Sequence, residues 1–268
     1  MLLSFRGAQH LRSWPYFYYR QKSHFDSAIL LSNPRNLSQF SRAQPISARA
    51  MSTGRGALIV FEGGDRCGKT TQTQLLVQSL QSMGLKAELW RFPDRTTPTG
   101  KMIDSYLSSR SEVDDAAIHL LFSANRWEKR AAMLRALREG TTLVVDRYSY
   151  SGVAFTASKG IPSLSISWCK APEEGLPAPD LLLYLELGAE DAAARGGFGS
   201  ERYETLDMQQ AVRRQFESLR DGSWTVVDAA RPRDAVHEEV KAHAVEAVRR
   251  CAEGLEPLRA LWSREPLA

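Results

Sequence analysis

Between residues 56 and 262, short apolar runs alternate with longer stretches in which apolar residues recur at helical spacing. The apolar runs are rich in Leu, Val and Ile, as in "TLVVD" and "DLLLYLEL". This alternation is typical of a parallel β-sheet covered by helices. We therefore predict an α/β fold, a doubly wound five-stranded parallel sheet with helices on both faces. The predicted strands are 57–62, 86–92, 142–146, 180–187 and 224–229, and the predicted helices are 69–83, 99–109, 114–138, 205–220 and 232–252.

The first 50 residues follow a different pattern. They contain seven Lys or Arg residues, eight Ser residues and one acid, Asp26, without a long apolar core. This composition is typical of an organelle transit peptide, disordered or cleaved; a disordered basic tail is the alternative. The arginines favour a mitochondrial over a plastid destination. A product starting at Met51 would lack the segment and stay in the cytoplasm or nucleus. The predicted folded domain covers 56–262.

Charge and composition narrow the classes of partner. The formal net charge is +4, but residues 1–50 contribute +6, so the rest sums to −2 and offers no basic footprint for nucleic acid. Because no run of 18 apolar residues occurs, we expect no membrane-spanning segment and no membrane partner. Cys67, Cys169 and Cys251 lie too far apart for a disulfide framework or a zinc cluster, which fits a reducing compartment.

The loop after the first predicted strand carries a phosphate-binding motif. Gly63, Gly68, Lys69 and Thr70 complete the pattern G-x-x-x-x-G-K-S/T between a strand and a helix. Glycines let backbone N–H groups converge on a phosphate, and Lys69 can reach the β- and γ-phosphate oxygens. The Thr70 hydroxyl is suited to ligate Mg²⁺. The sequence thus predicts a site for the phosphates of a nucleoside triphosphate.

The third predicted strand supplies a second part of this site. It ends at Asp146, which can hold Mg²⁺ directly or through water, and Arg147 follows. Such a loop alone does not name a reaction, because GTPases, motor ATPases and kinases share it. A guanine-reading Asn-Lys-x-Asp sequence does not follow the later strands, which disfavours a GTPase. A cation beside the metal ligand suggests a second anion, such as a phosphate acceptor.

Transfer between two nucleotides requires several cations near two polyanions. Arg95 and Arg147 follow strands whose carboxyl ends would share an edge with the phosphate loop, where open α/β sheets bind ligands. Other candidates are Arg66 in the loop, Arg126, and Arg195 and Arg202 in the Gly-rich segment 193–204. That segment reads as a mobile lid between two helices.

Five motifs, from about Gly56 to Trp262, resemble the thymidylate kinase family in its eukaryotic branch. They are "FEGGDRCGKTTQTQLL", "RFPDRTTPTGKMI", "HLLFSANRWE", "LVVDRYSYSGVAFT" and "GLPAPDLLLYLEL". The resemblance implies the strand order 2-3-1-4-5. It also implies that Asp65 binds the 3′-hydroxyl of the acceptor deoxyribose, whereas Arg66, Lys69 and Arg147 stabilise charge during transfer. Arg95 and Arg147 would bind the dTMP phosphate.

The resemblance further assigns the nucleotide pockets. Phe122 would stack on thymine, Arg126 would hydrogen-bond its O4 atom, and Phe155 would disfavour ribonucleotides. The implied dTMP site comprises Asp65, Phe92, Arg95, Phe122, Arg126, Arg147, Ser151, Phe155, Tyr203 and Gln209. The implied ATP site comprises Gly63, Arg66, Cys67, Gly68, Lys69, Thr70, Thr71, Arg147, Arg195 and Arg231.

The resemblance implies an ATP- and Mg²⁺-dependent kinase that converts dTMP to dTDP for dTTP biosynthesis, and a homodimer. Two alternatives stay open: a kinase of another monophosphate such as UMP, CMP or AMP, and a non-catalytic P-loop protein that binds ATP as a switch. The sequence departs from the family at Cys67, where Ala or Gly is more usual, and at Asp94, where many relatives have Glu.

Overall fold

The computed structural model describes residues 54–195, 199, 201–263 and 267. The predicted transit peptide lies outside the described residues, as does part of the predicted lid, 193–204. Of the described helices, none has the length and apolar character needed to cross a membrane.

The five strands form one parallel sheet in the order β2-β3-β1-β4-β5, which confirms the predicted fold class. The central strand, β1, is buried along its whole length, as its unbroken apolar sequence predicts. The strands are β1 (Leu58–Glu62), β2 (Ala87–Arg91), β3 (Thr142–Asp146), β4 (Leu181–Glu186) and β5 (Thr225–Asp228).

The five predicted helices all form, with ends within two residues of the prediction. They are α1 (Lys69–Ser82), α2 (Pro98–Leu107), α3 (Asp115–Arg138), α7 (Leu206–Leu219) and α8 (Arg233–Ala252). The structure adds α4 (Ser149–Ala157), α5 (Ile166–Lys170), the 3₁₀ helix η3 (Ala171–Glu173) and α6 (Ala189–Ala194). Helix α4 was not predicted from hydrophobic periodicity, because it is buried on most sides and has no polar face. The others are too short to establish a period.

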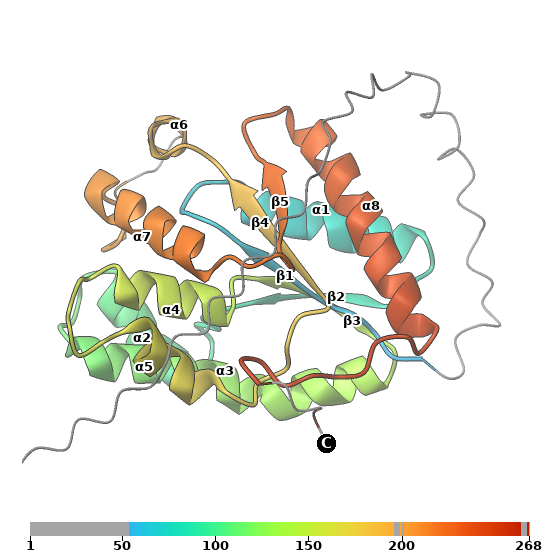
Figure 1. Cartoon of the computed structure of the whole chain (residues 1–268), viewed down its shortest axis with the longest axis horizontal. Coiled ribbons are helices and arrows are strands. Elements are labelled where there is room, and N and C mark those ends of the chain that lie inside the picture. The colour runs from blue at the N-terminus through green and yellow to red at the C-terminus, as the bar shows by residue number, and fades with distance from the viewer. Residues whose placement is uncertain (1–53, 196–198, 200, 264–266, 268) are drawn as a thin grey trace, which may run out of the picture. The chain divides into compact units, whose positions relative to one another are not determined.

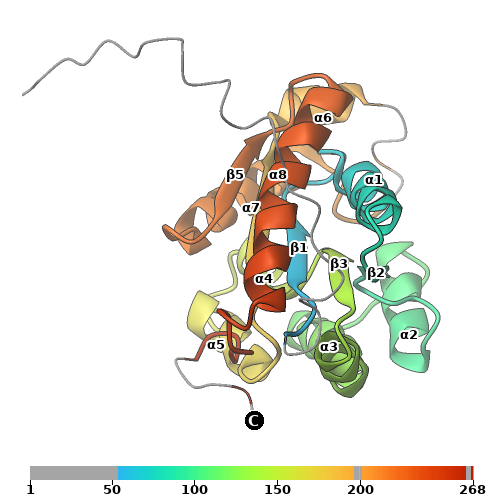
Figure 2. The same ribbon diagram turned by 90° about the vertical axis from the view of Figure 1, so that its right-hand side faces the viewer.

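Two layers of helices cover the sheet (Figure 1, Figure 2). Side chains alternate along a strand, so neighbouring residues of β1 enter different cores. Leu58 and Val60 pack with α3, α4 and α7, whereas Ile59 and Phe61 pack with α1 and α8. This double burial holds the carboxyl ends of β1, β2 and β3 side by side.

A buried ion pair joins the start of β1 to the segment before β4. Arg55 donates to both carboxylate oxygens of Asp180 at 2.6 and 2.7 Å, and the same carboxylate accepts from the Leu58 N–H at 2.8 Å. The side chains of Arg55 and Asp180 are 11% and 3% exposed. This pair lies at the amino end of the sheet, opposite the edge from which the phosphate loop leaves β1.

Candidate active site

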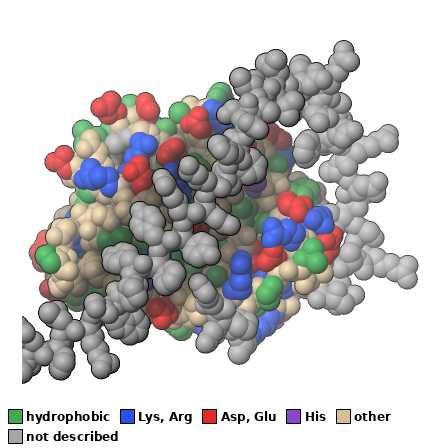
Figure 3. Space-filling model, in the orientation of Figure 1, with side chains coloured by type: hydrophobic (Ala, Val, Ile, Leu, Met, Phe, Trp, Pro, Cys, Tyr) green, Lys and Arg blue, Asp and Glu red, His purple; other side chains and the backbone are tan. Residues whose placement is uncertain are grey.

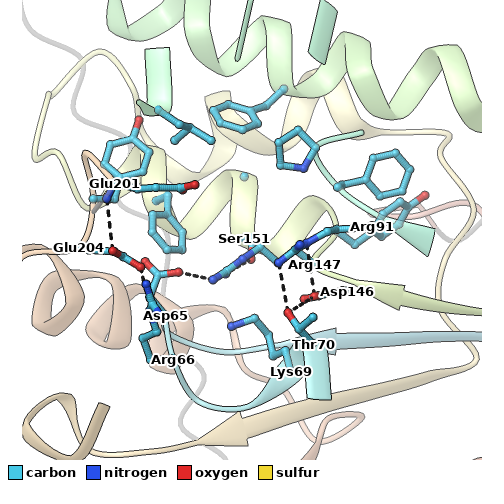
Figure 4. A pocket seen from close by; sticks show the side chains of 18 of the residues that line it. Asp65, Arg66, Lys69, Thr70, Arg91, Asp146, Arg147, Ser151, Glu201 and Glu204 are labelled. Atoms are coloured by element: carbon cyan, nitrogen blue, oxygen red, sulfur yellow. Dashed lines mark hydrogen bonds and ion pairs between the residues drawn. The ribbon is translucent and has the colours of Figure 1, made fainter. Parts of the chain in front are cut away.

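A cavity of about 570 Å³ opens at the carboxyl edge of the sheet, where β1, β2 and β3 end (Figure 4). Cationic side chains, carboxylates and aromatic rings share its wall. The lining comprises Asp65, Arg66, Gly68, Lys69, Thr70, Thr71, Arg91, Phe92, Pro93, Arg95, Leu107, Phe122, Arg126, Asp146, Arg147, Tyr148, Ser151, Gly152, Phe155, Thr156, Arg195, Glu201, Tyr203 and Glu204.

The phosphate loop runs from β1 into α1, as its motif predicts. Gly63 has φ +139°, and a Cβ there would lie 2.5 Å from the Leu185 carbonyl oxygen, so a side chain is excluded. Helix α1 starts at Lys69, which places the N-terminal end of its dipole at the cavity. The Lys69 ammonium donates to the carbonyls of Gly63 and Gly64 at 3.1 and 2.5 Å. The loop thus combines a helix N-terminus with a buried cation.

Thr70 and Asp146 meet beside this loop. The Thr70 hydroxyl donates to Asp146 Oδ2 at 2.6 Å, and the Arg91 guanidinium donates to Thr70 Oγ1 at 3.1 Å. Among the described residues, no three His, Cys, Asp or Glu side chains gather as a metal cage. A hydroxyl with one carboxylate is nevertheless the oxygen donor set that Mg²⁺ accepts when phosphates and water complete its shell. The pair therefore fits a nucleotide-bound magnesium ion.

Arg147 connects the phosphate loop to α4. It forms an ion pair with Asp65 and donates to the Gly63 carbonyl and the Ser151 hydroxyl, both at 3.2 Å (Figure 4). Burial acts to lower the pKa of Arg147, but the charges of Asp65, Asp146 and Glu62 outweigh it and raise the pKa. A permanently charged group is thus fixed at the centre of the site.

Glu62 anchors this junction from within the sheet. Its buried carboxylate accepts hydrogen bonds from the N–H groups of Tyr148 and Ser151, at 2.9 and 3.0 Å, and from the Ser151 hydroxyl at 2.5 Å. Burial raises the pKa of Glu62, against the opposing effect of those hydrogen bonds and of Arg147. Glu62 ends β1 and was not among the predicted site residues.

Further arginines face carboxylates from α2 and from residues 201–204. Arg95 donates to Asp104 and Glu201 at 2.8 and 2.7 Å, and Arg66 donates to Glu204 at 3.0 Å. Arg195 donates to the backbone carbonyls of Arg66 and Ala229, each at 3.0 Å. Arg66, Arg95 and Arg195, picked out from distant segments, thus converge on one cavity. Arg202, also a candidate, is ion-paired with Glu112 and does not line the cavity.

Aromatic rings and one buried arginine form the rest of the wall. Phe155 lies 5.5 Å from Tyr203 between ring centroids, and Arg147 lies 5.4 Å from the centre of the Phe155 ring. Arg126 is 2% exposed and binds the fully buried Glu173 through two hydrogen bonds. This part of the cavity can enclose a flat ring and offer it a hydrogen-bond donor.

Comparison with known proteins identifies the family. A family model described as thymidylate kinase matches residues 61–240. The chain belongs to the thymidylate kinase family. The thymidylate kinase of Arabidopsis thaliana is 53% identical over 209 residues, which cover 78% of each chain. The human thymidylate kinase is 49% identical over 215 residues, which cover 79% of this chain and all of that protein.

A solved thymidylate kinase structure, from Candida albicans, is similar with a TM-score of 0.67 and 36% identity. The match covers 74% of this chain and 95% of that one. These relatives are eukaryotic, as the motifs predicted.

Most of the residues chosen by resemblance to thymidylate kinases line the cavity. Four do not. Gly63 and Cys67 are buried residues of the loop, and Cys67 is 3% exposed within the core. Gln209 lies behind Asp65 and donates to its carboxylate at 2.5 Å. Arg231 is ion-paired with Glu239 on α8 and lies outside the cavity wall.

Several cavity residues of this thymidylate kinase family member were missed from sequence. Arg91 ends β2 at the same edge as Asp146, so its position on the strand could have indicated it. Tyr148, Gly152 and Thr156 belong to the unpredicted α4 and the residue before it. Glu201 and Glu204 lie in the segment read as a lid, where only arginines and Tyr203 were considered.

Proposed function

We propose that this protein transfers the γ-phosphoryl group of ATP to dTMP, giving ADP and dTDP, a step that supplies dTTP for DNA synthesis. The observation that carries the proposal is one cavity in which a phosphate loop faces an arginine-rich, aromatic-walled chamber. Membership in a family named for thymidylate kinase agrees with this chemistry. A protein that only binds ATP as a switch would not need the arginine-rich, aromatic part of the cavity.

The reaction needs positioning and charge neutralisation rather than a general base. An oxygen of the dTMP phosphate, already an anion, forms a bond to the γ-phosphorus while the bond from that phosphorus to the β–γ bridging oxygen breaks. Lys69, Arg66 and Arg147 lie where they can offset the negative charge of both nucleotides. Arg95 would hold the dTMP phosphate.

Mg²⁺ would bind at Thr70 and Asp146, directly or through water. The ion would supply charge neutralisation between the β- and γ-phosphates. The 2.6 Å hydrogen bond between Thr70 and Asp146 holds a hydroxyl and a carboxylate oxygen next to each other at the start of α1, which supports this assignment. On the donor nucleotide, Arg195 lines the cavity and would contact adenosine, whereas the same role for Arg231 rests on the resemblance alone.

The aromatic chamber suits a pyrimidine deoxynucleotide. Phe92 and Phe122 would enclose the thymine ring, with Arg126 at its O4 edge, and Phe155 would crowd a 2′-hydroxyl. Asp65 would bind the 3′-hydroxyl, and Gln209, which donates to Asp65, would orient that carboxylate. Tyr203 and Ser151 complete the wall.

The decisive experiment measures ADP formation from ATP with dTMP, dUMP, UMP, CMP or AMP as acceptor. We expect dTMP to accelerate ADP formation far above background hydrolysis, and UMP, CMP and AMP to have little effect. The panel matters because the Candida albicans enzyme is described as having broad substrate specificity. Equal ADP formation with and without every acceptor would favour an ATP-binding switch instead.

The assembly is proposed to be a homodimer. Met102 of α2 and Leu120 and Trp127 of α3 are 53%, 47% and 39% exposed, and an interface with a second copy would cover these apolar side chains. Sedimentation of the protein at micromolar concentration should give twice the chain mass, and Leu120→Asp should reduce it to the monomer.

On the face that Figure 3 shows, Lys and Arg side chains are interspersed with Asp and Glu, which favours small nucleotides over nucleic acid as ligands.

The localisation is proposed to be mitochondrial, with plastid as the alternative, on the composition of residues 1–50. A product starting at Met51 would remain in the cytoplasm or nucleus. Residues 1–50 fused to a fluorescent protein should direct it to mitochondria, and a chain starting at Met51 should not reach them.

A further inference from the structure

The buried pair of Arg126 and Glu173 stands out among the side chains around the cavity. Arg126 Nε donates to Glu173 Oε2 at 2.7 Å, and Nη2 donates to Oε1 at 2.5 Å. The side chains are 2% and 0% exposed, so neither charged group is hydrated by bulk water. A buried ion pair of this kind costs desolvation energy and seldom adds much net stability. Its presence at the wall of a binding cavity therefore suggests a role in recognition.

Glu173 is itself held rigidly by α3. It ends the short helix η3, whose Pro172 carbonyl accepts hydrogen bonds from Ser123 Oγ at 3.0 Å and from Trp127 Nε1 at 2.6 Å. Arg130 Nε donates to the Gly175 carbonyl at 2.8 Å. These donors and Arg126 share one face of α3, which fixes the carboxylate relative to the helix that carries the arginine.

Helix α4 confines the guanidinium from the other side. A Cβ built on Gly152 would lie 2.6 Å from Arg126 Nη2 and 3.3 Å from Nη1. Glycine at this position leaves just enough space for the planar group. Arg126 therefore has a carboxylate on one edge and backbone on another, and it cannot rotate freely.

We propose that Glu173 is a positioning residue that holds Arg126 so that its Nη1 donors face the acceptor base and select a carbonyl over an amino group. This inference rests on the proposed function. Glu173 occupies Nε and one N–H of Nη2, and none of the described residues accepts a hydrogen bond from Nη1. Arginine carries only donors, so it binds the carbonyl oxygen of thymine or uracil and repels the amino group of cytosine.

Removing the carboxylate charge should affect the acceptor base more than the transfer step. A neutral amide would leave the guanidinium buried without its counter-charge, so the guanidinium would turn toward the phosphates or water. The base would lose a directed donor, while the phosphate-transfer groups at the loop would stay in place. Selectivity and acceptor binding should therefore suffer more than the maximal rate.

The test compares Glu173→Gln with the unaltered chain, using dTMP and dCMP as acceptors. We expect KM for dTMP to rise about tenfold or more, kcat to change by less than about threefold, and the preference for dTMP over dCMP to fall about tenfold or more. Asp180→Asn is the matched control, because it breaks the other buried arginine–carboxylate pair, far from the cavity. It should lower Tm and leave the preference unchanged.

A double-mutant cycle separates positioning from general destabilisation. In an Arg126→Gln background, adding Glu173→Gln should not lower the preference further, because Glu173 acts through Arg126. This comparison also serves if Glu173→Gln alone does not fold, since the double variant buries no charge. A folded Glu173→Gln enzyme with unaltered KM and preference, or a further drop in the double variant, would overturn the inference. Failure of the unaltered chain to phosphorylate dTMP would instead overturn the proposed function.

Discussion

The Thr70 hydroxyl donates a 2.6 Å hydrogen bond to the Asp146 carboxylate, joining the first turn of α1 to the end of β3. This contact connects the phosphate loop with the strand end that carries Arg147. A hydroxyl and a carboxylate oxygen thus lie side by side in the cavity wall, which is the donor pair that the proposed magnesium site uses.

Asp146→Asn should keep this hydrogen bond but weaken the site for a cation. We expect kcat/KM to fall about 100-fold and the Mg²⁺ concentration for half-maximal rate to rise, because an amide oxygen carries no formal charge. A magnesium titration of steady-state rates measures both. Asp221→Asn, at an exposed turn, is the control and should behave like the unaltered chain. An unaltered magnesium dependence in Asp146→Asn would show that the ion does not bind at Asp146.

Arg66→Ala should separate catalysis from acceptor binding. The arginine lies in the phosphate loop, where it can stabilise charge on the moving phosphoryl group, and kcat should fall about 100-fold or more. KM for dTMP should change little, since the proposed function assigns its phosphate to Arg95 and Arg147. Arg213 of α7, whose side chain is 43% exposed and lies outside the cavity wall, offers a control, Arg213→Ala. Equal losses in kcat and in dTMP affinity would contradict the assigned role.

Tyr148→Phe should stabilise the fold. The Tyr148 hydroxyl is buried and finds no hydrogen-bond partner among the described residues, and burial raises its pKa. Deleting an unpaired buried hydroxyl should raise the free energy of unfolding by about 1 kcal/mol. Urea unfolding measures the change. Tyr106→Phe, which removes a hydroxyl bonded to Tyr203 at 3.2 Å, should destabilise instead. A loss of stability in Tyr148→Phe would indicate that its hydroxyl is satisfied.

His119 should make the stability depend on pH. Burial lowers the pKa of this ring below 6.5, and the charge of Arg126 adds to the effect. The unfolded chain therefore takes up a proton more readily than the folded one as the pH falls below 6.5. The contribution is present above that pH and is lost progressively below it.

We expect Tm to fall between pH 7.5 and 5.5, and to fall less in His119→Gln. Thermal unfolding across this range gives both slopes. His243→Gln, on an exposed position of α8, should keep the unaltered slope. Parallel curves for His119→Gln and the unaltered chain would show that this ring does not control the dependence.

Strand ends explain how much of the site the sequence predicts. Arg95, Asp146 and Arg147 were found because each follows or ends an apolar run, and parallel strands bring such positions to one edge. The carboxylate partners of Arg95 and Arg126 were not found. Glu173 is 47 residues from Arg126 in the chain and lies in a 3₁₀ turn with no periodic pattern. Such pairings depend on how connecting segments fold, which hydrophobic periodicity does not encode.

The resemblance to thymidylate kinases predicted more site residues than hydrophobic periodicity did, but it also failed for a side chain in a connecting turn. It placed Phe122 of α3 and Phe155 of α4 at the cavity, because each lies on a helix within a matching motif. Arg231 lies in the turn between β5 and α8, where the path of a few residues decides whether the side chain faces the cavity or Glu239. The fold was therefore predictable from one chain, whereas side-chain direction in turns was not.

The ion pairs of the cavity have a consequence for how nucleotides arrive. Arg95 with Asp104 and Glu201, and Arg147 with Asp65, already hold carboxylates. An incoming phosphate must displace these carboxylates, so on binding each arginine exchanges one anionic partner for another. The net electrostatic gain is then small, and affinity for the acceptor should vary little with ionic strength. Asp104 and Glu201 would each give up a charged partner when a phosphate binds Arg95.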